Sequence, residues 1–195
     1  MSHHPLLDAH ILSLLPNCLE KRVILDIACG FGEWGYSIRK AKDGVPYIVG
    51  LDIWGPYLGK LRRMKIYDGL VRAKIPHIPI RDKSVDISLA CEILEHLPKH
   101  DGYKLLSELE RITRKTIIVS FPLNLPQKEV GGNPFERHVS QWLSEELIRY
   151  GYETKRVRTH PRVLLYASVH AMIDRVKRTF FRIWTRRFIV GKKEL

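Results

Sequence analysis

The sequence lacks the features that would place it in a bilayer, in an oxidising compartment or in a disordered state. Its 195 residues include no run of about 18 apolar side chains, which excludes a membrane-spanning helix. The N-terminus has neither the cationic start nor the apolar stretch of a secretory signal, so we expect a cytoplasmic protein. The three cysteines, at positions 18, 29 and 91, form no CxxC pair, which favours reduced thiols over a disulfide or zinc framework. The length suits one domain with a sizeable core.

Acidic residues are scarce toward the C-terminus. The whole chain has 33 Lys and Arg against 21 Asp and Glu, a net charge of +12. Residues 152–195 carry 12 of the basic side chains and only three acidic ones, whereas residues 1–151 are close to neutral. A strongly basic segment, residues 152–195, therefore follows a part of the chain, residues 1–151, whose net charge is close to zero.

Predicted strands and helices alternate through residues 1–151. Apolar runs predict strands at 23–28, 47–52, 69–75, 85–90 and 116–121, and helical periodicity predicts helices at 6–15, 36–41, 57–64, 103–112 and 141–150. Two more runs, 152–157 and 163–167, are expected to pair as an antiparallel terminal hairpin. The alternation predicts an α/β fold, a Rossmann-like, doubly wound, seven-stranded and mostly parallel sheet.

A glycine-rich turn follows the first predicted strand. The segment Gly30-Phe31-Gly32-Glu33-Trp34-Gly35 allows a sharp turn and a close approach to a ligand. Asp52 lies 20 residues beyond Gly32, at the end of the second strand, where its carboxylate can accept hydrogen bonds from ribose hydroxyls. This pattern fits either a nicotinamide-dependent dehydrogenase or a methyltransferase. Asp26 favours the latter, because a carboxylate there would repel a pyrophosphate but suits the positive charge of S-adenosylmethionine.

With these residues the sequence resembles the class I S-adenosylmethionine-dependent methyltransferases, within the broad group similar to ubiquinone and small-molecule methyltransferases. Residues 23–32 look like the first motif of that family, with Ala28 where glycine is more usual. Residues 50–53 are similar to its ribose motif, and residues 78–86 followed by 91–97 look like its fourth-strand region. The resemblance covers about residues 20–158.

The resemblance implies S-adenosyl-L-methionine as cofactor and roles for several residues. The implied cofactor-binding residues are Asp26, Ala28, Gly30 and Gly32 near the methionine end, Asp52 at the ribose, Ile53 against the adenine, and Cys91 and Glu92 at the border of the pocket. One position departs from the family. Lys74 stands where an acid often accepts a hydrogen bond from the adenine amino group, and a lysine cannot accept one.

Two histidines are candidates for a catalytic base. His96 follows the fourth predicted strand and His138 lies in the irregular segment 122–140, which we expect either to cover the substrate or to form an ordinary surface turn. A structural role is the alternative for each histidine. Carboxylates and His96 cluster in residues 92–96, but the zinc pattern HExxH is absent, so no metal site is expected.

Residues 169–190 have the pattern of a basic amphipathic helix. Apolar side chains follow one face and four arginines another, so we divide the chain into a methyltransferase domain, 1–168, and a helical tail, 169–195. The helix could lie on the anionic inner surface of a membrane, dock on its own domain, or contact nucleic acid.

The expected function is transfer of a methyl group to a small-molecule, lipid or glycan-precursor nucleophile. The alternatives are methylation of tRNA or rRNA, with the basic tail contacting phosphates, and a non-catalytic partner subunit that binds the cofactor.

Overall fold

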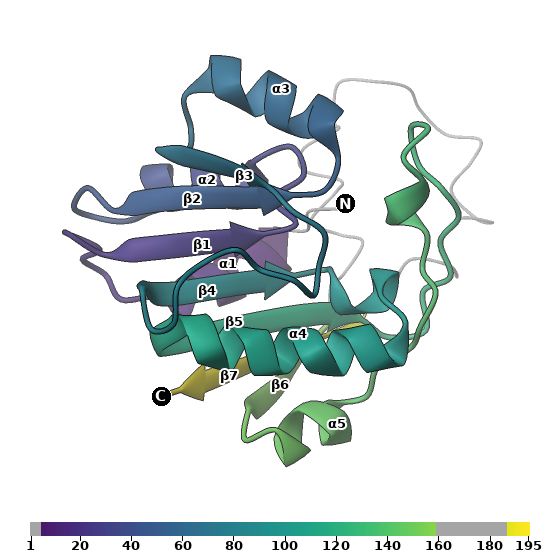
Figure 1. The fold of residues 1–195 in the computed structure, drawn as a ribbon. Helices are drawn as coiled ribbons and strands as arrows, with labels where there is room; N and C mark the ends of the chain where they lie inside the picture. The colour runs from purple at the N-terminus through teal and green to yellow at the C-terminus, as the bar shows by residue number, and fades with distance from the viewer. Residues whose placement is uncertain (1–4, 159–186) are drawn as a thin grey trace, which may run out of the picture.

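The computed structural model describes residues 5–158 and 187–195, which form a layered α/β domain (Figure 1). A seven-stranded sheet has the order β3-β2-β1-β4-β5-β7-β6. The first five strands run parallel, and β7 is antiparallel to both of its neighbours. The strands are β1 (Val23–Ile27), β2 (Tyr47–Asp52), β3 (Gly69–Arg72), β4 (Val85–Cys91), β5 (Thr113–Pro122), β6 (Glu153–Arg158) and β7 (Arg187–Glu194). The predicted fold class is confirmed.

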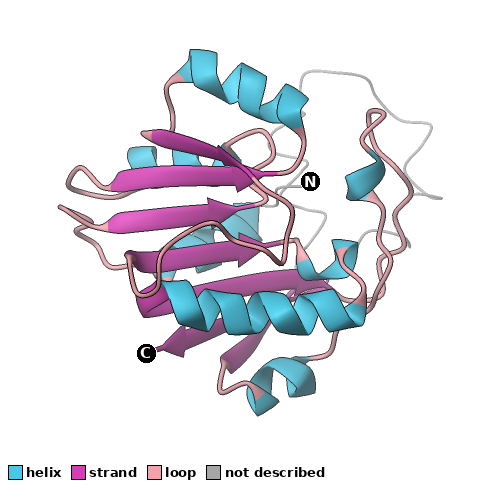
Figure 2. Ribbon diagram, in the orientation of Figure 1, coloured by secondary structure: helices cyan, strands magenta, loops and turns pink. Residues whose placement is uncertain are grey.

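Helices cover both faces of the sheet (Figure 2). In Figure 1, α4 lies in front of the sheet, whereas α1 and α2 lie behind it. The helices are α1 (Pro5–Ser13), α2 (Glu33–Ala41), α3 (Gly55–Met64), α4 (Lys99–Ile112) and α5 (Ser144–Arg149), with short 3-10 turns η1 (Leu94–His96) and η2 (Pro134–Glu136). No helix in the two described ranges is both long enough and apolar enough to traverse a bilayer.

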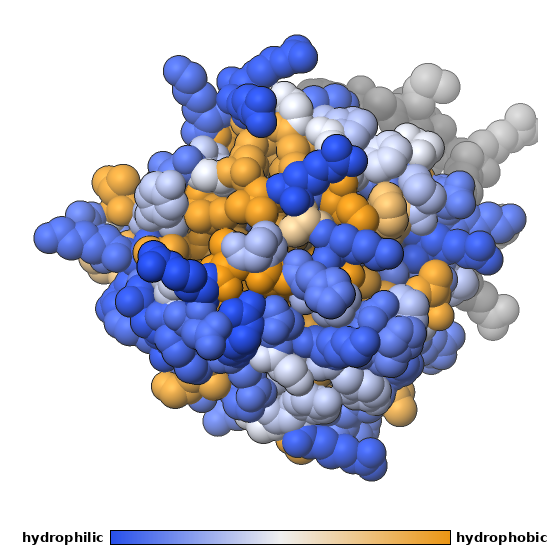
Figure 3. All heavy atoms as spheres, viewed as in Figure 1, coloured by the Kyte–Doolittle hydropathy of each residue, from blue (hydrophilic) through white to orange (hydrophobic). Residues whose placement is uncertain are grey.

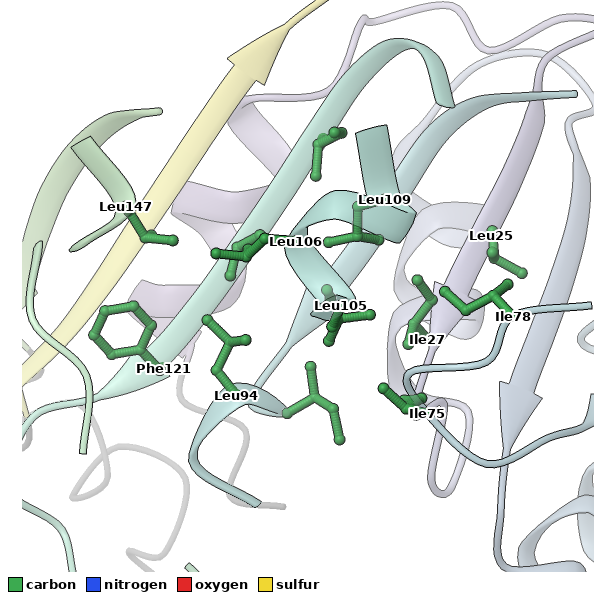
Figure 4. Close-up of a cluster of buried hydrophobic side chains, with 14 of the residues drawn as sticks. Leu25, Ile27, Ile75, Ile78, Leu94, Leu105, Leu106, Leu109, Phe121 and Leu147 are labelled. Atoms are coloured by element: carbon green, nitrogen blue, oxygen red, sulfur yellow. The ribbon is translucent and has the colours of Figure 1, made fainter. Parts of the chain in front are cut away.

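Two apolar clusters fill the space between the helices and the sheet. The front cluster joins Leu105, Leu106 and Leu109 of α4 to Leu25 and other strand residues (Figure 4). The rear cluster joins side chains of α1, α2 and α3 to the opposite face of the same strands. Since alternate residues of a strand point to opposite faces, a strand between two clusters buries side chains on both faces and is mostly apolar. All seven residues of β4 are buried, and its two polar members, Asp86 and Ser88, are hydrogen-bonded.

Apolar side chains also reach the surface of the front face. Figure 3 shows them gathered between α3 and α4, with polar side chains around them. Val23, Val49 and Val71, from three adjacent strands, are partly buried hydrophobic residues packed against the front cluster. The segment between β3 and β4 is irregular, so no helix of residues 5–158 covers this part of the sheet.

The C-terminal residues correct one prediction from the sequence. Among the described residues β6 pairs with β7, at 187–194; the run at 163–167, which the sequence predicts to pair with it, lies outside the described residues. Residues 187–190 of the expected amphipathic helix belong to β7, where Phe188 and Val190 are buried in the rear cluster. Residues 169–186 of that helix also lie outside the described part. The end of the expected tail is therefore an inner strand of the sheet.

Candidate functional site

The turn after β1 is built from residues with left-handed backbone conformations. Ala28, Gly30 and Gly32 have φ values of 57°, 51° and 85°. Gly32 caps the N-terminus of α2, and a Cβ there would lie 2.4 Å from a methyl carbon of Leu61. Glycine is therefore required at 32 both by the backbone and by the packing. Ala28 adopts the same backbone region with a side chain, which costs about 1–2 kcal/mol.

Asp52 ties this turn to the end of β2. Its Oδ2 accepts a hydrogen bond from the backbone N–H of Gly30 at 2.9 Å, and its Oδ1 accepts one from the N–H of Trp54 at 2.7 Å. Burial raises the pKa of this carboxyl group, and the two backbone hydrogen bonds oppose that rise. Each oxygen of a carboxylate has a second lone pair, so Asp52 keeps the capacity to accept two further hydrogen bonds.

Asp26 is buried behind the turn. Only 1% of Asp26 is exposed, and its Oδ2 accepts a hydrogen bond of 2.5 Å from the hydroxyl of Tyr67. Burial, followed by the negative charge of Asp26, raises the pKa of the Tyr67 hydroxyl and of the Cys29 thiol. The predicted contact of Asp26 with a cofactor stays a prediction.

A cavity of about 250 Å³ opens at the carboxyl ends of β1, β2 and β4. In parallel sheets this edge is where ligands bind. Its lining residues are Ala28, Asp52, Ile53, Tyr57, Lys74, Ile75, Glu92, Ile93, His96, Leu97, Pro98, Asp101, Asn133, Phe135 and Glu136. Of the predicted cofactor residues, four line the cavity: Ala28, Asp52, Ile53 and Glu92.

The other predicted cofactor residues lie around the cavity and not in its lining. Gly30 and Gly32 shape the turn, and Asp26 supports it from behind. Cys91 is the last residue of β4, and burial, followed by the charge of Asp26, raises the pKa of its thiol well above the usual value. A thiol in that state is an inert packing group.

Glu92 marks the exit from β4. Its φ of 55° turns the chain away from the sheet, and its N–H donates to the carbonyl of Ser120 at 2.9 Å. The Ser120 hydroxyl donates to Glu92 Oε1 at 3.2 Å. Because these two bonds hold the residue on both sides, the carboxylate has a fixed place in the cavity wall.

His96, which lines the cavity, lies against His138. Their ring centroids are 4.7 Å apart at an interplanar angle of 80°. Nδ1 of His96 donates to the carbonyl of Arg137 at 3.2 Å, and Nδ1 of His138 donates to the carbonyl of Leu125 at 2.5 Å. Burial and the neighbouring His138 lower the pKa of His96 to about 4, so its ring is neutral at pH 7.

Glu95 lies beside the two histidines and is 3% exposed. Its Oε1 is 4.0 Å from Nε2 of His138, and its Oε2 has no hydrogen-bond partner among the described residues. Burial, and then the charge of Glu92, raises the pKa of Glu95 well above its ordinary value. A buried carboxyl oxygen without a hydrogen-bond partner is costly, so the position of Oε2 needs a functional explanation.

The irregular segment after β5 is fixed to the turn η1. The N–H groups of Val139 and Ser140 both donate to the carbonyl of Glu95, at 2.8 and 3.1 Å. The indole Nε1–H of Trp142 donates to the carbonyl of Leu94 at 2.9 Å. These bonds place His138 against Glu95 and His96.

The same segment also covers the cavity. Three of its residues, Asn133, Phe135 and Glu136, line the space, and Figure 1 shows the segment beyond the arrowheads of the strands. The hydroxyl of Tyr57, on α3, donates to Oε1 of Glu136 at 3.2 Å. The expected substrate cover therefore bridges from η1 to α3.

Sequence reasoning missed two residues of this site, Tyr57 and Tyr67, because neither belongs to a motif. Glu95 and Glu136 lie in the segments 92–96 and 122–140, which the sequence does single out, but it assigns neither residue a role of its own.

The comparisons with known proteins agree with this geometry. A model of the methyltransferase domain family matches residues 25–120. An uncharacterised protein of Methanocaldococcus jannaschii is 30% identical over 114 residues, 55% of this chain and 46% of that protein. The demethylmenaquinone methyltransferase of Lactiplantibacillus plantarum is 29% identical over 133 residues, 64% of this chain and 53% of that enzyme. The chain thus spans about half the length of these curated relatives.

A solved structure shares the fold. The complex between the Haloferax volcanii Trm112 methyltransferase activator and a methyltransferase contains a chain with a TM-score of 0.66 and 17% identity. The match covers 94% of this chain and 86% of that one. At this level of identity the likeness extends to the fold alone.

Proposed function

We propose that this chain, which belongs to the class I S-adenosylmethionine-dependent methyltransferases, methylates a small-molecule, lipid or glycan-precursor nucleophile. The observation that carries the proposal is the position of Asp52. Its carboxylate closes the glycine turn through Gly30 and also lines the cavity. A turn and an acid joined in this way provide the hydrogen-bond acceptors that ribose hydroxyls need.

The residues in and around the cavity support binding of S-adenosylmethionine. Asp52 would hold the ribose, Ile53 would pack on the adenine, and Ala28, Gly30 and Gly32 would surround the methionine end. Asp26 would supply negative charge behind that end, with Cys91 and Glu92 at the border. Lys74 also lines the cavity, so its ammonium group would lie near the adenine without accepting a hydrogen bond.

When bound, S-adenosylmethionine supplies an activated methyl group on a sulfonium. The protein then has to align the acceptor and remove its proton. His96 lines the cavity and is neutral at pH 7, and its Nδ1–H donates to a backbone carbonyl, so the lone pair is on Nε2. Nε2 of His96 is therefore our first candidate for the base, and His138 is the second.

Calorimetric titration with S-adenosylhomocysteine, run in parallel with NAD, tests the cofactor assignment. We expect binding of S-adenosylhomocysteine and none of NAD. In Asp52→Asn the affinity should fall by roughly 100-fold, because two hydrogen bonds to a charged group weaken at about 1.5 kcal/mol or more each. Asp43→Asn is the matched control, since Asp43 is exposed and precedes β2 at the opposite end of the sheet. Preference for NAD would contradict the proposal.

The acceptor class needs a second experiment. The intact chain is incubated with S-adenosylmethionine labelled in the methyl group and with lipid, small-molecule or RNA fractions of a cell extract. We expect label in the lipid or small-molecule fraction. Label in the RNA fraction would favour the alternative in which the basic residues contact phosphates. Cofactor binding without label in any fraction would favour a non-catalytic partner subunit.

A further inference from the structure

We propose that Glu95, His96 and His138 bind one divalent transition-metal ion at the acceptor side of the cavity. One ligand atom from each residue lies within 4.8 Å of the others. Two imidazoles and one carboxylate are the ligand set of many catalytic metal sites, which keep further coordination positions open. The sequence led us to expect no metal site, because the zinc pattern HExxH is absent. The third residue of the cluster, His138, is 42 residues from His96, so no contiguous pattern joins the three.

The histidine tautomers suit metal binding. Each Nδ1–H donates to a backbone carbonyl, that of Arg137 for His96 and that of Leu125 for His138. A neutral imidazole held in this way has its lone pair on Nε2, the atom that would bind the ion. Such a second bond, to a carbonyl or a carboxylate, is the usual way in which proteins orient metal-binding histidines.

Glu95 provides an independent reason to place a cation here. The residue is 97% buried by area, and its Oε2 has no hydrogen-bond partner in the described part of the chain. Leaving a carboxylate oxygen buried and unsatisfied costs free energy that a bound cation would recover. The carbonyl of the same residue accepts two backbone hydrogen bonds, so the carboxylate is held in place by a rigid main chain.

The charges around the cavity also favour a cation. Four carboxylates line it, those of Asp52, Glu92, Asp101 and Glu136, against one lysine, Lys74. A divalent ion at this point would reduce the repulsion among these carboxylates.

The open positions of such an ion would face the cavity, because His96 is part of its lining. If the chain is the methyltransferase proposed above, an acceptor oxygen could bind there. The ion would lower the pKa of that oxygen and orient it. The site therefore favours an acceptor that offers an oxygen nucleophile. This last step rests on the proposed function, whereas metal binding itself does not.

Metal binding can be measured directly on the intact chain. After removal of metals with EDTA, the protein is titrated with Co²⁺, whose visible absorption reports coordination by nitrogen and oxygen ligands, and then with Zn²⁺ as a competitor. We expect one saturable equivalent of Co²⁺ per chain, displaced by Zn²⁺. In Glu95→Gln and His138→Gln, affinity should fall by roughly 100-fold or more, since loss of even an outer-shell partner costs 10–100-fold.

His100→Gln is the matched control. The His100 side chain is 70% exposed and lies on α4, so this variant should bind Co²⁺ like the wild type. Circular dichroism and titration with S-adenosylhomocysteine show whether each variant is folded. Absence of a saturable equivalent, or binding that persists unchanged in Glu95→Gln and His138→Gln, would overturn the proposal. Co²⁺ binding without S-adenosylhomocysteine binding would instead contradict the cofactor assignment and leave the metal site supported.

Discussion

On the side of the cavity that we propose binds the cofactor (the cofactor side), the turn after β1 and Asp52 come from adjacent parallel strands, and the N–H of Gly30 donates a hydrogen bond to the Asp52 side chain. On the side that we propose faces the methyl acceptor (the acceptor side), His96 and His138 come from two irregular segments, which are fixed to each other through the carbonyls of Leu94 and Glu95. The first arrangement follows from strand pairing. The second depends on a few specific contacts, so it should be the easier of the two to change.

The strongest test of that dependence is Trp142→Ala. This side chain is 2% exposed, contacts Tyr103 and Phe121, and donates a hydrogen bond to Leu94. We expect a loss of about 3–5 kcal/mol in the free energy of unfolding, measured with urea. Trp142→Phe, which removes the N–H and the five-membered part of the indole, should cost about 1–3 kcal/mol through the lost hydrogen bond and the lost volume, because the Ser140 hydroxyl still donates to the Leu94 carbonyl. An equal loss of unfolding free energy in the two variants would mean that the packing of the Trp142 ring does not stabilise the acceptor side.

Replacing one glycine on the cofactor side and one in the segment over the cavity should have intermediate effects on the free energy of unfolding. Gly32→Ala should cost about 2–5 kcal/mol, because a φ of 85° is unfavourable for alanine and the new Cβ would overlap Leu61. Gly131→Ala, in the segment over the cavity, should cost only about 1–2 kcal/mol, because its φ is 58° but no atom lies within 4 Å of the new Cβ. Urea denaturation of both variants compares them, and a larger loss at Gly131 would reverse the expected order.

The smallest effect is expected for Ala28→Gly. Removing the side chain relieves about 1–2 kcal/mol of left-handed strain at φ 57°, and the greater freedom of the unfolded chain offsets about 0.4–1 kcal/mol. The net result should be a stabilisation below about 1.5 kcal/mol, measured by thermal unfolding. A destabilised variant would show that the Ala28 methyl group makes contacts worth more than the strain.

The cofactor side could be predicted from the sequence because its signals are local. A buried strand, glycines and an acid 20 residues later are all consequences of one βαβ unit, and Asp52 lies where that spacing places it. For the acceptor side, the sequence predicts His96 and His138 as separate candidates and does not predict that they are in contact. Their contact depends on where the segment after β5 packs, and no periodicity in the sequence indicates that.

Residues 188–190 show why a sequence that has a helical pattern can nevertheless form a strand. Phe188 falls on the apolar side of a helical repeat, yet it also belongs to the run Phe188-Ile189-Val190, which suits a buried strand. In the structure this run pairs with β5 on one side and β6 on the other. Long-range pairing in the sheet overrides the local helical pattern.

The insertion of β7 between β5 and β6 determines which strands form the borders of the sheet. In the described part of the chain one border is β3, only four residues long, and the other is β6, with exposed Lys155, Arg156 and Arg158. A border strand with unpaired backbone groups invites pairing with another chain, and short length and clustered positive charge both discourage it. By taking up the apolar run of residues 188–190 internally, the fold leaves a charged strand at its border and so limits aggregation by sheet extension.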